Sequence, residues 1–89
     1  MKTIEVYVSE NKTTHPTKYG CVRVFLDNDY TYGYFINELY FFSLLNEEQQ
    51  RKYSINNSYE NTHFYVSVEV ANAIVEHGST VYKKIYFDN

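Results

Sequence analysis

Hydrophobic and polar residues alternate with a period of two over several short stretches of the chain. The clearest are residues 3–9, 19–26, 63–68 and 80–87, and the aromatic run at residues 30–36 follows the same rhythm. This period is typical of strands that bury one face. The pattern therefore predicts a sheet of four or five strands, antiparallel or mixed.

Two stretches carry helical signals instead. Over residues 37–53, Asn37 can cap a first turn, and Asn46 with Gln49 three positions later has the spacing of a capping box. This segment predicts either one kinked helix or two short helices. A second helix is predicted over residues 69–77.

The second helix is marked by apolar spacing and by a stop signal. Ala71, Ile74 and Val75 recur at intervals that face a core, and Gly78 follows as a C-terminal cap. The predicted order is β-β-β-α-β-α-β. It indicates an α+β fold, with a small sheet and two helical segments on one face.

Length bounds the architecture. The 89 residues fit a single α+β domain covering positions 1–89, with no room for a second. A chain of this size buries about two-thirds of its unfolded surface at best, so its core is modest. A homodimer would help to stabilise it.

Charge and cysteine content narrow the class further. Eight basic residues against eleven acidic ones give a net charge of −3. This balance argues against direct binding of nucleic acid and against a polybasic membrane anchor. Cys21 is alone, which fits a reducing compartment. The chain shows neither an apolar signal-peptide core nor an apolar run of about 20 residues. We expect a cytoplasmic protein.

One alternative is RNA binding. Residues 6–11 resemble the second ribonucleoprotein motif of RNA-recognition domains, and residues 18–24 loosely resemble the first. The resemblance implies aromatic side chains that stack bases on adjacent strands. However, Tyr7 and Tyr19 are only twelve positions apart, whereas the family places a helix and a strand between its motifs. A plain hairpin is the favoured interpretation.

A second alternative is calcium binding. Asp27, Asp29, Thr31 and Glu38 fall at positions 1, 3, 5 and 12 of an EF-hand loop. Position 6 is Tyr32, where that loop needs glycine, and the preceding segment reads as a strand. A solvated turn is favoured, and we expect no metal and no cofactor.

No catalytic motif is present in the sequence. The three histidines, His15, His63 and His77, lack a partner at metal-ligand spacing. There is no nucleophile elbow, phosphate loop or paired-carboxylate motif. We expect a binding protein rather than an enzyme.

Aromatic content gives the strongest functional signal. Eleven tyrosines and six phenylalanines make up 19% of the chain. So small a domain cannot bury every ring in one core, and tyrosine suits interfaces. Carboxylates flank three tyrosines in one segment, a pattern that can engage a basic protein surface. The candidate partner-binding residues are Asp27, Asp29, Tyr30, Tyr32, Tyr34 and Glu38. The competing interpretation is that these tyrosines belong to a sheet face covered by a helix.

The size, acidity, richness in tyrosine, asparagine and glutamate, and single compact domain resemble those of small phage and mobile-element proteins that block host defence, such as anti-CRISPR and anti-restriction proteins. The resemblance is one of type and carries over no functional residue. It implies an inhibitor that occupies the basic surface of a nucleic-acid-handling host protein. The alternatives are a viral assembly protein, a dimeric adaptor, or a protein that sequesters a nucleotide.

Overall fold

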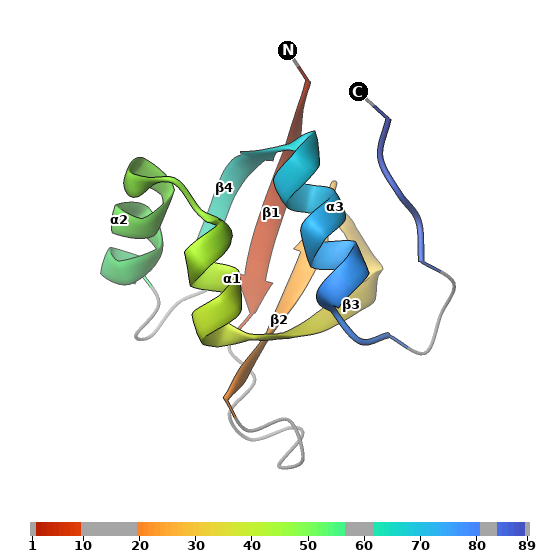
Figure 1. Cartoon of the computed structure of the whole chain (residues 1–89), viewed down its shortest axis with the longest axis horizontal. Coiled ribbons are helices and arrows are strands. Elements are labelled where there is room, and N and C mark those ends of the chain that lie inside the picture. The colour runs from red at the N-terminus through yellow and green to blue at the C-terminus, as the bar shows by residue number, and fades with distance from the viewer. Residues whose placement is uncertain (1, 10–19, 57–61, 81–83, 89) are drawn as a thin grey trace.

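The protein folds around a four-stranded antiparallel sheet with strand order β3-β2-β1-β4 (Figure 1). The computed structural model describes residues 2–9, 20–56, 62–80 and 84–88, with the backbone alone described at 30–32, 55–56 and 62. The strands are β1 (Thr3–Ser9), β2 (Cys21–Leu26), β3 (Asp29–Asn37) and β4 (Thr62–Ser67). The α+β class and four of the predicted strands are confirmed, although Tyr19 lies outside the described residues.

Three helices pack against one face of this sheet. They are α1 (Glu38–Leu44), α2 (Glu47–Asn56) and α3 (Val68–His77). In Figure 1, α1 and α3 cross in front of the strands, and α2 stands beside α1 next to β4. The segment predicted as one kinked or two short helices is thus two helices, which makes three in the described chain. None of these three has the length and apolar character that a membrane crossing requires.

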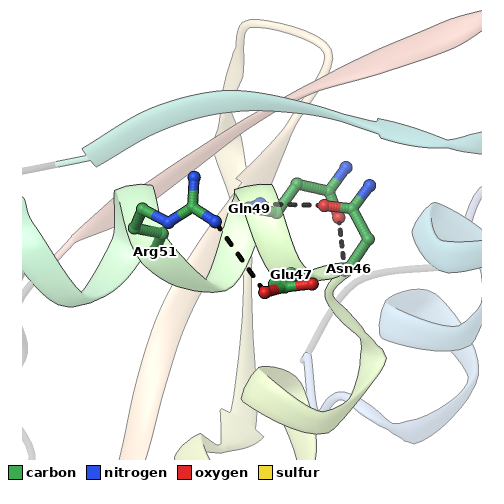
Figure 2. Close-up of polar contacts among 4 residues, drawn as sticks. All are labelled: Asn46, Glu47, Gln49 and Arg51. Carbon is green, nitrogen blue, oxygen red and sulfur yellow. Dashed lines mark hydrogen bonds and ion pairs between the residues drawn. The ribbon is translucent and has the colours of Figure 1, made fainter.

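Local capping explains where the first two helices begin. The Asn37 side chain accepts a hydrogen bond from the Tyr40 N–H at 2.9 Å and starts α1. At the start of α2, Asn46 Oδ1 accepts from the Gln49 N–H at 2.8 Å, and Gln49 Oε1 accepts from the Asn46 N–H at 2.9 Å (Figure 2). The predicted capping box is therefore confirmed. Gln49 Nε2 also donates to the Tyr65 carbonyl at 2.7 Å, which ties α2 to β4.

The core lies between the sheet and the helices. Alternate residues of the strands point toward the helices and are buried, as the period of two requires. The helices contribute a central ring, Phe41, and the apolar face of α3. The residues with almost no exposed surface are Ile4, Val6, Val24, Ile36, Phe41, Val66, Ile74 and Val75.

The prediction of a final strand over residues 80–87 is wrong for its described part. Residues 80 and 84–87 are not in a strand, and positions 81–83 lie outside the described residues. A single isolated bridge joins Ser79 to Phe35 of β3. Beyond it, residues 84–88 (the C-terminal segment) run beside α3 (Figure 1). Hydrogen bonds from side chains of α3 take the place of a strand ladder.

Close packing explains the glycine that ends α3. Gly78 donates its N–H to the Ile74 carbonyl at 2.8 Å. A Cβ atom at this position would lie 2.7 Å from the Ile74 oxygen and 2.9 Å from Tyr34 Cβ. Gly78 therefore lets the end of α3 lie directly against β3.

Candidate functional site

An acidic turn joins β2 to β3. Leu26 pairs with Asp29, so Asp27 and Asn28 form a two-residue hairpin turn, with φ angles of 58° and 60°. Two consecutive positive φ values are the signature of a type I′ turn, which aspartate and asparagine tolerate better than most residues. The Asp27 N–H donates to the Glu5 carbonyl at 2.8 Å and fixes the turn against β1.

This turn borders a hollow of about 330 Å³. The lining comes from three parts of the chain: the end of β2 with the turn, the middle of β3, and the C-terminal segment. Apolar and aromatic surface dominates the lining, and two carboxylates lie within it. The lining residues are Leu26, Asp27, Asp29, Tyr34, Ile85 and Phe87.

Asn72 of α3 holds the wall that the C-terminal segment forms. Its Nδ2 donates to the Phe87 carbonyl at 2.9 Å, and its Oδ1 accepts from the Phe87 N–H at 2.8 Å. One side chain thus satisfies both backbone groups of one extended residue, as a neighbouring strand would. Phe87 packs against the core, whereas the side chain of Ile85 is 52% exposed.

Glu76 of α3 provides a second attachment. Its carboxylate accepts a hydrogen bond from the Tyr86 hydroxyl at 2.6 Å, and its backbone carbonyl accepts one from Lys84 Nζ at 3.0 Å. The hydrogen bond to Glu76 raises the pKa of Tyr86, because losing the proton would break the bond and place two negative charges together. The C-terminal segment is therefore attached to α3 at both of its ends.

The six candidate residues from the sequence do not form one patch. Asp27, Asp29 and Tyr34 line the same hollow. Tyr34 is only 5% exposed, so it lies in the floor of the hollow and in the core, as the competing interpretation predicted for the tyrosines. The side chains of Tyr30 and Tyr32 lie outside what the structure describes. Whether any of these residues contacts a partner stays a prediction.

Glu38 lies away from the acidic turn. It starts α1, directly after the nine residues of β3, which span about 30 Å when extended. Its carboxylate accepts a hydrogen bond from the Tyr53 hydroxyl at 2.6 Å and so links α1 to α2. The spacing that resembles an EF-hand is therefore a strand and not a loop. Within the described ranges, no three His, Cys, Asp or Glu side chains gather closely enough to hold a metal ion.

The sequence did not reveal the wall of the hollow that the C-terminal segment forms. The predicted strand over residues 80–87 includes Ile85 and Phe87, and no role is assigned from the sequence to Asn72. Its place on the helix gave one signal, since asparagine is a poor residue for a helix interior unless its side chain has a partner.

The lining limits the chemistry of the hollow. Its described residues offer two carboxylates and apolar surface, without a lysine, arginine, histidine or nucleophile. Carboxylates attract cations, and aromatic and aliphatic walls accept an apolar stem. The described lining residues offer no positive charge to a phosphate group. The arrangement therefore suits binding of a cationic side chain.

The protein is thus a small two-layer α+β domain whose surface hollow has apolar walls and two carboxylates. No family model, curated protein or solved structure matches the chain.

Proposed function

We propose that this chain is a stoichiometric inhibitor that binds the basic surface of a nucleic-acid-handling protein. The observation that carries the proposal is the hollow, in which exposed Asp27 and Asp29 meet an apolar floor and wall. Net charge supports the same direction, at −3 for the whole chain. A basic groove that normally holds nucleic acid is the complementary surface.

The hollow fits the side chains that such grooves present. The aliphatic stem of an arginine or lysine packs on Tyr34 and Phe87, and its charged head reaches Asp27 or Asp29. The acidic groups speed association at low salt, and the apolar contacts slow dissociation. Occupying the groove excludes the nucleic acid, so this chain inhibits its partner without binding DNA or RNA itself.

The biological setting of the proposal is defence evasion in a host cytoplasm, of the anti-CRISPR or anti-restriction type. A single small domain that blocks a groove needs neither a cofactor nor catalysis. The nucleotide-sequestering alternative is less favoured, because the described lining holds two carboxylates and no cation to meet a phosphate.

Paired substitutions with equal charge change test the proposal. The chain carrying Asp27→Asn and Asp29→Asn is compared with one carrying Glu47→Gln and Glu48→Gln, exposed residues at the start of α2. Asparagine tolerates the positive φ of the turn, so the fold is kept. Both chains and the wild type are immobilised and exposed to a host lysate, with captured proteins quantified by mass spectrometry.

We expect the wild type and the α2 variant to capture the same nucleic-acid-binding protein, and the turn variant to capture much less. With the purified partner, added DNA should compete with the chain. Association should slow for the turn variant, most strongly at low salt. Equal capture by all three chains, or capture that DNA does not affect, contradicts the proposal.

A further inference from the structure

The sheet has a second face, which none of the described helices covers. In Figure 1, α1 and α3 lie in front of the strands. The residues of β1, β2 and β4 that alternate with the buried core positions therefore belong to the opposite face of the sheet. The shortest extent of the Cα trace is 20 Å, which accommodates one sheet and one layer of helices. This second face, called the back face here, is therefore not built into the helical core.

A row of rings crosses the back face at its centre. Tyr7 of β1 pairs with Phe25 of β2 on one side and with His63 of β4 on the other. The ring centroids lie 5.7 Å and 4.5 Å apart, respectively. Tyr65, two residues after His63, is 59% exposed. Aromatic residues in this density on a sheet face are typical of protein interfaces.

Arg23 flanks the row on one side. Its guanidinium carbon lies 5.0 Å from the Phe25 ring centroid and 5.4 Å from that of Phe35. It crosses Gly33, where a Cβ atom would meet the arginine side chain. The cation thus rests on aromatic surface. Its Nε is buried and has no hydrogen-bond partner in the described chain.

Glu5 flanks the row on the other side. It precedes Tyr7 by two positions on β1, whereas Arg23 pairs with Ser9, two positions after Tyr7. One carboxylate oxygen of Glu5 accepts a long hydrogen bond of 3.3 Å from the Tyr65 hydroxyl. The other, Oε1, is buried and has no partner among the described residues. Glu5 and Arg23 are thus the two residues of the described chain with an unsatisfied buried side-chain atom.

We propose that the back face joins two copies of this chain in a symmetric dimer. A two-fold axis that lies in the interface between Tyr7 and Phe25 places the Glu5 side of each copy against the Arg23 side of its partner. Such an interface is self-complementary, as closed dimers require. It lays the two rows across each other, with contact made chiefly by the half-buried Tyr7 and the exposed His63, because Phe25 is 8% exposed. It also sets the half-buried Glu5 side chain of each copy beside the Arg23 side chain of the other. Because Glu5 and Arg23 lie on opposite sides of the ring row, a second copy related by a two-fold axis presents an arginine to each glutamate and a glutamate to each arginine.

The size of the face sets the expected affinity. Three strands of six or seven residues and the nine-residue β3, spaced about 4.8 Å apart, cover about 440 Å² in plan. Stable dimers commonly bury about 800 Å² of accessible surface per partner, so this interface lies toward the small end. We expect a dimer with micromolar affinity that dissociates on dilution.

Charge reversal with mixing tests the symmetry directly. Glu5→Arg alone and Arg23→Glu alone each set like charges against one another across the two-fold axis. An equimolar mixture of the two variants places unlike charges together again in a heterodimer. Sedimentation velocity over about 1 µM to 1 mM measures the assembly state of the wild type, each variant and the mixture. Circular dichroism confirms that each variant is folded.

Two further variants separate interface effects from folding effects. Tyr65→Glu adds charge at an exposed position of the back face and should produce a folded monomer. Leu39→Glu changes a residue that is 80% exposed on α1, in the other layer, and should leave the dimer intact.

We expect dimers for the wild type, the Leu39 variant and the mixture, and monomers for Tyr65→Glu and each single reversal. A wild type that stays monomeric at the highest concentration overturns the proposal. So does a dimer unaffected by Tyr65→Glu, or disrupted single variants that do not recover on mixing. If either charge-reversal variant fails to fold, the assembly states of the Tyr65→Glu and Leu39→Glu variants test the proposal: a monomer for the first and a dimer for the second support it, and any other result overturns it.

Discussion

Replacing Asn72 with alanine should release the C-terminal segment without unfolding the domain. The side chain makes two hydrogen bonds with the Phe87 backbone, at 2.9 Å and 2.8 Å. Each is worth about 1 kcal/mol net, so their loss weakens the attachment by about 2 kcal/mol. Since 1.4 kcal/mol is a factor of ten, local opening should become about thirtyfold more frequent.

Amide hydrogen exchange measured by NMR reads this opening directly. The Phe87 N–H is itself the donor to Asn72, so its exchange rate follows the population of the open segment. The free energy of global unfolding should fall by at most about 1.5 kcal/mol, because alanine in place of asparagine favours the helix by about 0.5 kcal/mol and offsets part of the loss. Glu69→Ala, at an exposed position of the same helix, is the matched control.

The Asn72→Ala chain should therefore stay folded with at most a moderately lower melting temperature than the Glu69→Ala control, whereas exchange at Phe87 should differ about thirtyfold between them. Because Ile85 and Phe87 form one wall of the hollow, the Asn72 variant should also bind the proposed partner more weakly. Unchanged Phe87 exchange in Asn72→Ala would show that the two hydrogen bonds do not hold the segment. Fast exchange throughout the domain would show that Asn72 supports the whole fold instead.

Three further outcomes are expected. Tyr34→Ala should lower the free energy of unfolding in urea by about 3 kcal/mol, because the ring is part of the core. Gln49→Ala should cost about 1–2 kcal/mol by the same measurement, whereas Arg51→Ala, whose ion pair is exposed and 3.9 Å long, should cost almost nothing. The Tyr86 pKa, followed by ¹³C NMR, should exceed the usual value of about 10 and fall toward it in Glu76→Gln. Since the folded-state pKa is raised, this contact stabilises the segment fully below pH 10 or so and ceases to do so as pH rises through the raised value.

The elements with local signals were predictable from the sequence. The strand at residues 3–9 alternates strictly, so its pattern identified both the strand and its buried face. Asn46 and Gln49 identified the start of α2, because a capping box is specified within four residues. The acidic turn was also visible, since aspartate and asparagine favour it for local reasons.

The structure of the C-terminal segment could not be predicted from local sequence signals. Its alternation of apolar and polar residues describes an extended chain with one buried side, but does not say what covers that side. The same alternation is compatible with an extended segment that pairs with a strand and with one that is held by the side chain of Asn72 on a helix. The choice was made by contacts between residues fifteen positions apart, Asn72 and Phe87, which no local window contains.

The candidate site was divided for a related reason. Nearness in sequence suggested that Asp27 and Glu38 act together, but the extended strand between them places them at opposite ends. Alternation put Tyr34 on one face of β3 without revealing which face the helices cover. The close contact of Gly78 with Tyr34 decides that choice and makes the tyrosine part of the core.

The two proposed surfaces are connected through β1. The Asp27 N–H is bonded to the Glu5 carbonyl, so the turn beside the hollow is anchored to the residue whose side chain flanks the dimer face. In the proposed dimer, each copy therefore holds its own acidic turn next to the shared interface. A single copy offers one hollow of about 330 Å³ and one set of contacts. If the proposed inhibitor acts as the proposed dimer, its two hollows form a linked pair, and linkage raises affinity by about 10²–10⁴ when both sites can be reached together. Under these two proposals, dimerisation through the back face raises the affinity of a small inhibitor without enlarging its core.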